Sequence, residues 1–412
     1  MKSIQLNPQK TQTKMLWNIA LFLSSILTLI TLIHSVIYFS LISFLPDIFL
    51  SYKRSLVVIL LLLSTSLFIA SILVHISHNL FTRTLYGISA LWYGFATFAF
   101  VASILIWMIK GMLLLIPSVA PQKILSIAAV TLYAAAVCLV LFGFINAFRL
   151  QTRRISVEIR NLPPQWQTRT IVHLSDLHIG SFWGRAFLEK VVQRVNRLEP
   201  DILAITGDLF DGASGQYEKY VDVLQKFKAD KAKLYISGNH EVYAGWKEAG
   251  DAVRKAGFVD LDNCAMIIDG LGFIGIGSPR PSAKRFDLVS LMSNVHLKPE
   301  SPKVLLYHTP TDAGFNADNR IASHSTSYLA PRTRFQNAIE LGISLQLSGH
   351  THAGQYIPFT WLTQRIYNNY HYGLHRIKDF HLNVQSGTGT WGPPLRIGSS
   401  SEIVWITLSK AR

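Results

Sequence analysis

The 412-residue sequence predicts a protein of two parts, in which a four-helix transmembrane region precedes a layered α/β (αββα) domain. Half of its residues are hydrophobic and only 15% are charged, whereas soluble domains contain about a quarter charged residues. The charges are unevenly distributed. Residues 1–150 contain nine Lys and Arg and one Asp, and residues 151–412 contain the other 30 Lys and Arg and 23 Asp and Glu. In the second part, short apolar runs alternate with segments of helical periodicity.

The first 150 residues contain four long apolar stretches, at about 16–37, 56–76, 85–109 and 124–148. Each is long enough to cross about 30 Å of hydrocarbon, and no Asp or Glu lies inside any of them. The first stretch exceeds the apolar core of a secretory signal peptide, so we interpret it as a retained span. Buried helices of a soluble protein are the alternative, which four such lengths in 150 residues disfavour. Spans without acidic residues also argue against a proton or ion pathway.

The distribution of Lys and Arg in the flanking segments predicts the orientation. Eight lie in the N-terminal tail, the second loop and the segment after the fourth span, against four in the first and third loops. We therefore expect a multi-pass protein of the cell membrane with both termini in the cytoplasm. The two cysteines, Cys138 and Cys264, form no disulfide framework, which fits a cytoplasmic domain. The net charge of +15 is compatible with nucleic-acid binding, but no basic and aromatic motif supports it, and the expected partner is the lipid bilayer.

Residues 151–168, which include a Pro-Pro pair, are expected to form a linker to a domain over 169–412. Six short apolar runs predict buried strands of a sheet that is covered on both faces. They lie at 170–175, 201–206, 232–237, 272–277, 303–308 and 344–349. The segments 185–198, 215–227 and 332–341 have helical spacing between these runs.

Polar side chains follow five of the six predicted strands. They are Asp176 and His178 in "SDLHIG", Asp208 in "TGDLFDG", Asn239 and His240 in "SGNHEVY", His308 in "YHTP", and His350 and His352 in "SGHTHAGQ". Each residue alone is explained as a cap or a turn former. Because loops at the carboxyl ends of neighbouring strands converge, the set together predicts one shared site. His173, inside the first run, is interpreted as a packed residue and not as a ligand.

The motifs "DLH", "GDLFD", "GNHE", "YH" and "GHTHAGQ", in this order, resemble those of the calcineurin-like metallophosphoesterase superfamily. The resemblance covers about residues 168–408 and is greatest to membrane-anchored bacterial phosphoesterases. It implies two divalent metal ions with Asp208 as the bridging ligand. By position, the first ion would also be held by Asp176, His178 and His352, and the second by Asn239, His308 and His350.

In the family, the histidine of "GNHE" donates a proton to the leaving group or stabilises the transition state, and here that residue is His240. Mixed imidazole and oxygen donors suit Mn, Fe or Zn rather than Ca, and the sequence does not choose among the three. His350 and His352 are two positions apart, so each can point to a different ion. Ala353 departs from the family pattern, which usually has glycine there, and this narrows the approach to the site.

The resemblance implies a two-metal phosphohydrolase that cleaves phosphoester or pyrophosphate bonds. Because a membrane anchor concentrates an enzyme near lipids, we expect an amphipathic or lipid-linked substrate. The resemblance implies a UDP-diacylglucosamine as one such substrate, since similar enzymes cleave its pyrophosphate. The segment 356–377 combines aromatic and cationic residues that suit the headgroup region, and Phe359, Trp361 and Arg365 are its candidate substrate-binding residues. An aromatic packing loop is the alternative interpretation of this segment.

Two other functions remain open at this stage. One is a tethered phosphodiesterase or phosphomonoesterase that acts on soluble substrates. The other is a non-catalytic membrane scaffold, which the presence of all seven candidate ligands and His240 disfavours.

Overall fold

The computed structural model describes residues 8–116, 121–211, 217–280, 291–292, 298, 300–313 and 330–411. These residues form two compact units. One contains the helical residues up to Ile69 together with Ile88–Leu141, and the other contains Ala70–Gly87 together with the chain from Phe142 onward. The short connection between the second and third long helices thus belongs to the same unit as the α/β domain.

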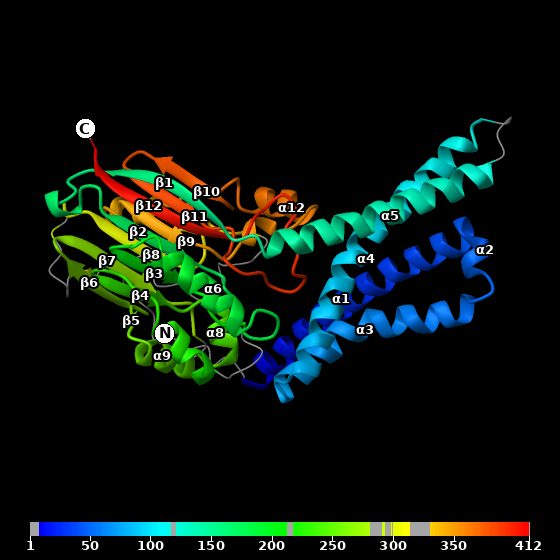
Figure 1. Ribbon diagram of the computed structural model, residues 1–412, viewed down its shortest axis with the longest axis horizontal. Coiled ribbons are helices and arrows are strands. Elements are labelled where there is room, and N and C mark those ends of the chain that lie inside the picture. The colour runs from blue at the N-terminus through cyan, green and yellow to red at the C-terminus, as the bar shows by residue number, and fades with distance from the viewer. Residues whose placement is uncertain are drawn as a thin grey trace, which may run out of the picture. The chain divides into compact units, whose positions relative to one another are not determined.

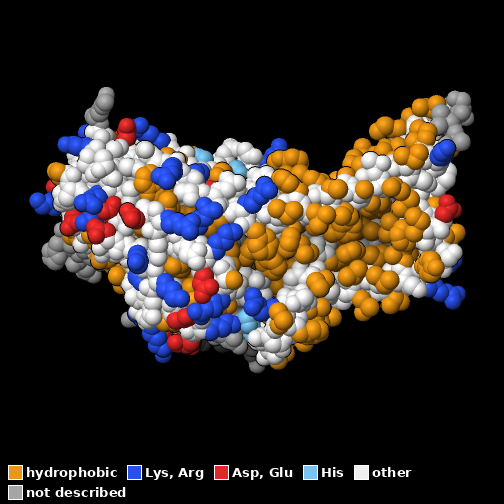
Figure 2. Space-filling model, viewed as in Figure 1, with side chains coloured by type: hydrophobic (Ala, Val, Ile, Leu, Met, Phe, Trp, Pro, Cys, Tyr) orange, Lys and Arg blue, Asp and Glu red, His pale blue; other side chains and the backbone are white. Residues whose placement is uncertain are grey.

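Four long helices form the N-terminal part (Figure 1). They are α1 (Pro8–Phe44), α3 (Lys53–Ile76), α4 (Leu80–Leu113) and α5 (Pro121–Ala147), and the short α2 (Pro46–Phe49) follows α1. All four are long and apolar enough to cross a membrane, and Figure 2 shows a hydrophobic surface over this part of the chain. Hydroxyl groups within them, such as that of Thr28, donate to a backbone carbonyl one turn earlier. Such bonds allow a small polar side chain to lie in hydrocarbon without an unsatisfied donor.

Polar side chains also pair between helices of the first unit. The indole of Trp92 donates to His34 Nε2 at 3.0 Å, and the indole of Trp107 donates to the Ser40 hydroxyl at 2.8 Å. Ser103 and Tyr133 share a third hydrogen bond of 2.8 Å. These pairs connect α1 with α4 and α4 with α5, which is the kind of polar contact that supplements van der Waals packing between transmembrane helices.

The α/β domain contains two six-stranded sheets (Figure 1). The strand order of the first sheet is β1 (Gln151–Ile159), β12 (Glu402–Lys410), β2 (Thr170–Leu174), β3 (Ile202–Thr206), β4 (Ala232–Ile236) and β5 (Val259–Asp260). That of the second is β10 (Gly373–Ile377), β11 (Phe380–Val384), β9 (Leu345–Ser348), β8 (Lys303–Tyr307), β7 (Leu271–Ile276) and β6 (Cys264–Ile268). Strands β2 to β5 run parallel, as do β7, β8, β9 and β11.

The domain has the four predicted layers, in the order helices, sheet, sheet and helix, and a hydrophobic core lies between each pair of neighbouring layers. Alternate residues of each strand face opposite sides, so Ile202 and Ala204 of β3 pack between the sheets, whereas Leu203 and Ile205 pack outward. Helices α6 (Arg185–Asn196), α7 (Val221–Leu224) and α9 (Trp246–Lys255) cover the outer face of the first sheet. Helix α11 (Gln336–Glu340) covers the second sheet, where Ala338 packs with Leu305. Burial on both faces explains why the central strands are continuous apolar runs.

The structure differs from the sequence-based expectation at the domain's edges. The expected linker 151–168 contains β1 and a short 3₁₀ turn (Pro164–Trp166), because Val157 and Ile159 are buried between the sheets while β1 pairs with β12 in parallel register. The helices expected at 215–227 and 332–341 are shorter. The first consists of a 3₁₀ turn (Glu218–Tyr220) and α7 among the described residues, and the second of α11 alone.

Candidate metal centre

The eight residues predicted to hold the metals or to act beside them lie in the segments that directly follow β2, β3, β4, β8 and β9, at one edge of the sheets. Five of them have a left-handed backbone with φ between 49° and 69°, and these are Asp176, His178, Asp208, His350 and His352. For a residue with a Cβ, this conformation costs about 1–3 kcal/mol and persists only where its surroundings enforce it. The loops are therefore held in shapes that the residues would not adopt by themselves, with their side chains directed toward a common point.

The first cluster consists of Asp176, His178 and His352. The Nε2 atoms of His178 and His352 are 3.0 Å apart, and Asp176 Oδ1 lies 3.4 Å from His352 Nε2 and 4.0 Å from His178 Nε2. Asp208 Oδ2 is 3.9 Å from His178 Nε2. Asp176, His178 and His352 each offer one ligand atom, and these three atoms all lie within 4.8 Å of one another. Their donor types are those that bind first-row transition metals.

The second cluster shares Asp208. Its Oδ2 atom lies 3.1 Å from His308 Nε2, which is 3.3 Å from His350 Nδ1. The amide oxygen of Asn239, the first residue of α8 (Asn239–Ala244), is buried without a hydrogen-bond partner among the described residues. A buried oxygen without a donor beside an acidic and imidazole cluster fits a metal ligand, because such a group is otherwise costly to bury.

Two glycines allow the loops to approach one another this closely. A Cβ atom on Gly349 would lie 2.1 Å from Asp176 Oδ2, and a Cβ atom on Gly238 would lie 2.1 Å from Asp208 Oδ1. Any other residue at either position would displace a candidate ligand. The geometry of the site thus requires glycine at position 349, before His350, and at position 238, before Asn239.

The protonation of the imidazoles also fits cation binding. Burial, followed by the neighbouring imidazoles, lowers the pKa of His178 and of His352 well below 6.5, so both are neutral and able to coordinate. His308 differs, because the Asp208 carboxylate outweighs the effect of burial and raises its pKa to about 10. A positive charge is therefore favoured beside Asp208, where a metal cation would replace the proton.

Comparisons with known proteins agree with this geometry. The model of the calcineurin-like phosphoesterase family matches residues 169–354. A Campylobacter jejuni protein named an uncharacterized metallophosphoesterase is 31% identical over 291 residues, and the match covers 68% of each chain. This chain belongs to the calcineurin-like phosphoesterases.

Other relatives of this phosphoesterase are similar over a comparable region. A Danio rerio transmembrane protein with a metallophosphoesterase domain is 29% identical, over 66% of this chain and 61% of its own length. A metallophosphoesterase of Helicobacter pylori is 30% identical, over 58% of this chain and 59% of its own. The chain thus spans about 60–68% of the length of these three relatives. Members of the family are metal-dependent phosphoester hydrolases that generally use a binuclear metal centre.

His240 lies beside the two clusters of this phosphoesterase. Its backbone N–H donates to Asp208 Oδ1 at 2.9 Å, and its Nδ1–H donates to the Asp211 carbonyl at 3.1 Å, which leaves Nε2 for another partner. Burial would lower its pKa, but Asp208 and Asp211 together raise it. This direction favours the protonated ring that a proton donor requires.

Three further residues hold the loops of the site, and the motif analysis did not assign them. Buried Glu241 accepts hydrogen bonds from the backbone N–H groups of Gly238, Asp208 and Phe210 at 2.7–3.0 Å, and so joins two ligand loops. The buried guanidinium of Arg396 donates to the carbonyls of His352, Gly387 and Gly389. Asp211 Oδ1 lies 3.8 Å from His178 Nδ1. Glu241 occupies the third position of α8, a helix-capping signal that could have identified it.

The candidate substrate residues lie on a helix and not on the expected loop. Phe359, Trp361 and Arg365 belong to α12 (Phe359–Ile366), which follows the turn of His352 closely in the chain, and all three side chains are exposed. The structure brings two other aromatic residues to His240. The rings of Tyr243 and Trp391 lie 5.8 Å and 5.7 Å from it and are 68% and 55% exposed.

Proposed function

We propose that this chain is a membrane-anchored two-metal phosphohydrolase that cleaves phosphoester or pyrophosphate bonds. The observation that carries the proposal is the position of Asp208, whose Oδ2 atom is within 4 Å of imidazole nitrogens from both clusters. Two cations placed close together repel each other, and a carboxylate between them offsets this repulsion.

Asp208 would be shared by both ions. Asp176, His178 and His352 would complete the site of one, and Asn239, His308 and His350 that of the other, with Mn, Fe or Zn as the metal. A bound pair of such ions lowers the pKa of coordinated water and neutralises charge on a phosphoryl group. The burial of Asp176, His178, Asp208 and His308, which strengthens electrostatic interactions, supports this role.

His240 would act beside the ions as the proton donor to the leaving-group oxygen. Its raised pKa, its free Nε2 atom and its position next to Asp208 support this role. The hydrogen bond from Nδ1–H to Asp211 fixes the ring orientation, so the donor is held in place before the substrate binds.

The substrate would be amphipathic, and a UDP-diacylglucosamine is one candidate. Trp361 is 65% exposed and lies with exposed Phe359 and Leu362 on α12, which continues from the turn that carries His352. Together with Tyr243 and Trp391 near His240, these side chains provide apolar surface for a lipid chain or a base next to the phosphate-binding region. Soluble substrates are the competing class.

The four apolar helices would cross the membrane, with the metal centre in the cytoplasm. The connection between α3 and α4 supports the crossings by α4 and α5 independently of the loop charges, which alone favour the cytoplasmic side. His78 bonds the Gly180 carbonyl at 3.2 Å and Arg83 bonds the Phe182 carbonyl at 3.3 Å, so the connection contacts the domain that follows α5. Two crossings separate the connection from the domain, which puts both on the same side of a bilayer.

A substrate comparison on the detergent-purified chain with Mn²⁺ tests the proposal, together with elemental analysis. We expect close to two metal ions per chain and a higher kcat/KM for a nucleotide-linked lipid than for p-nitrophenyl phosphate or a bis-p-nitrophenyl diester. Higher turnover of the soluble esters would indicate the tethered phosphoesterase. A protein that holds metal but hydrolyses none of these substrates would contradict the enzyme proposal.

A further inference from the structure

The C-terminal end of α5 is bonded to the loop that precedes β12. The side-chain amide of Asn146 donates to the carbonyls of Arg396 and Ser399 at 2.9 and 3.3 Å, and the backbone N–H of Arg396 donates to the Gly143 carbonyl at 2.9 Å. All four residues belong to the compact unit of the α/β domain. The last turn of α5 therefore holds both backbone polar groups of Arg396.

The side chain of Arg396 extends this contact to the candidate metal centre. Its guanidinium donates to the His352 carbonyl at 2.9 Å and to the Gly389 carbonyl at 2.6 Å. The Gly389 N–H donates in turn to the Asp176 carbonyl at 2.9 Å. Arg396 thus fixes the backbone of two residues that would hold the first ion, one directly and one through Gly389.

The position of this guanidinium depends on where its own backbone is held. The side chain is fully buried, and its Nε atom has no hydrogen-bond partner among the described residues. Its other nitrogens donate to three backbone carbonyls and to the Ser399 hydroxyl. A buried charge with uncharged acceptors is costly, and a shift of the loop would break several of these bonds at once. The arrangement is therefore stable only while the loop stays where α5 holds it.

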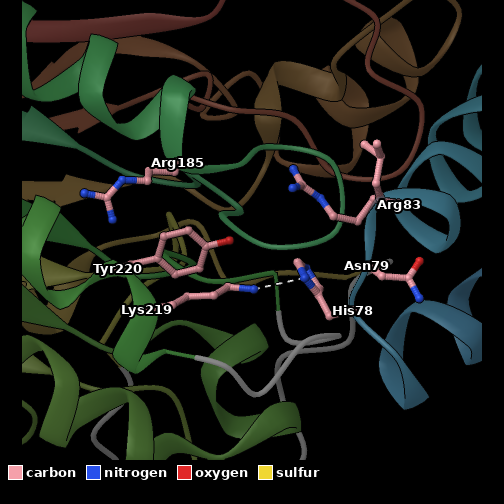
Figure 3. A pocket seen from close by; sticks show the side chains of 7 residues that line it. His78, Asn79, Arg83, Arg185, Lys219 and Tyr220 are labelled. Atoms are coloured by element: carbon pink, nitrogen blue, oxygen red, sulfur yellow. Dashed lines mark hydrogen bonds between the residues drawn. The ribbon is translucent and has the colours of Figure 1, made fainter.

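A second contact of the apolar helices reaches the loop of another ligand of the same ion. Arg83 donates to the carbonyls of Ser181 and Phe182 at 3.4 and 3.3 Å, three and four positions after His178. Figure 3 shows its side chain extending from α4, in blue, toward this loop of the domain, in green. Residues 70–87 belong to the same compact unit as the loop. Both contacts therefore reach segments that carry ligands of the first ion.

We propose that the last turn of α5 is part of the metal centre, and that Asn146 is a positioning residue for the ligands of the first ion, acting through Arg396. This role rests on the proposed function, because the ion itself is proposed there. It gives the fourth apolar helix an effect on metal affinity in addition to anchoring. Loss of a group that orients a metal ligand commonly weakens metal binding by about 10- to 100-fold.

Mn²⁺ binding to the full-length protein in detergent tests this role. Asn146→Ala removes both bonds to the loop. Asn196→Ala is the matched control, because the Asn196 amide also bonds two backbone groups but lies at the end of α6, away from the strand ends that carry the ligands. Bound Mn²⁺ per chain is measured by elemental analysis after equilibrium dialysis over a range of Mn²⁺ concentrations. Thermal unfolding of the metal-free proteins shows whether each variant folds.

We expect the wild type and Asn196→Ala to bind two ions with the same affinities. Asn146→Ala should bind one of the two roughly tenfold more weakly, and its hydrolysis of p-nitrophenyl phosphate should need a correspondingly higher Mn²⁺ concentration. Arg396→Lys should weaken the same ion. The N146A/R396K double variant should be little worse than Arg396→Lys, because two residues that act through one contact are not additive.

The outcomes separate this role from the proposed function. Equal Mn²⁺ affinities of Asn146→Ala and the wild type, with two ions bound to each, overturn the role and leave the two-metal hydrolase intact. Additive losses in the double variant also overturn it, because Asn146 would then act independently of Arg396. A wild type that binds no Mn²⁺ contradicts the metal centre itself. If Asn146→Ala does not fold, Asn146→Ser answers the same question, because it removes the amide and keeps a polar side chain.

Discussion

Asp208 is the residue on which both candidate metal clusters depend, because its Oδ2 atom is shared between them. Asp208→Asn keeps the shape of the side chain but removes the charge that would hold two cations together. We expect the purified variant to retain clearly less metal than the wild type and to lose most activity. Elemental analysis measures this, with Asp230→Asn as a control on an exposed carboxylate. If Asp208→Asn retained the full metal content of the wild type, this result would contradict the bridging role of Asp208.

His240 is expected to affect chemistry and not metal binding. His240→Ala should keep the metal content of the wild type and reduce kcat by about 10²–10⁴-fold. The loss should be larger for an alkyl phosphodiester than for a p-nitrophenyl ester, because nitrophenolate leaves without needing a proton. An equal loss for both esters would contradict the role as proton donor.

His173 gives the α/β domain a dependence on acid pH. It is fully buried, with Nε2–H bonded to Thr206 Oγ1 at 2.8 Å and Nδ1 accepting from Asn383 at 2.9 Å, and burial lowers its pKa to about 3. The unfolded chain binds a proton below about pH 6.5, whereas the folded chain does so only near pH 3. Stability from this residue is therefore present above pH 6.5 and is lost as the pH falls, by up to about 1.4 kcal/mol per pH unit.

His173→Gln removes this titration while keeping a polar side chain in the same place. Thermal unfolding of both proteins between pH 7 and pH 4 should show a shallower fall in Tm for the variant than for the wild type. Parallel curves would mean that His173 does not contribute to the acid sensitivity.

Helix α12 is the element that we expect to contact lipid. Replacing Phe359 and Trp361 with Ser removes two exposed aromatic side chains without opening a core. The expected result is a several-fold rise in KM for a lipid-linked substrate and little change for p-nitrophenyl phosphate. Ile267→Ser, on the exposed part of β6, is the control. An equal effect on both substrates would mean that α12 has no special role toward lipid.

The elements show which sequence signals are reliable. The six central strands are predictable because burial on both faces requires continuous apolar runs, as in "DILAIT" around β3. Charged residues hid edge strand β1 from a search for apolar runs. Arg154 and Glu158 lie on its exposed side, and Arg153, on the opposite side, pairs with buried Glu402. The helix predicted at 332–341 was too long for a different reason. Phe335 has a left-handed backbone, which a right-handed helix cannot include, so α11 begins only at the next residue.

At the scale of the whole molecule, the orientation of the four proposed membrane spans would decide which compartment the substrate occupies. Exposed Cys264 reports on the α/β domain, and Cys138 lies in α5. In intact cells, the Cys138→Ser variant should react with a membrane-impermeant maleimide only after permeabilisation. Lys53 lies at the start of α3, on the side predicted to be outside the cell. A cysteine in its place, in a chain without the two native cysteines, should therefore react before permeabilisation. The reverse pattern would place the metal centre outside the cell.

The sequence by itself determined the four apolar helices, the layered α/β domain and the eight residues of the candidate centre. These follow from the length of apolar segments, from burial on both faces of a sheet, and from polar residues at strand ends, all of which are local properties of the chain. Only the tertiary structure decided how Glu241 and Arg396 hold the ligand loops and how the end of α5 holds Arg396. Asn146 and Arg396 are 250 positions apart in the chain, and such pairs leave no local pattern because folding alone brings them together.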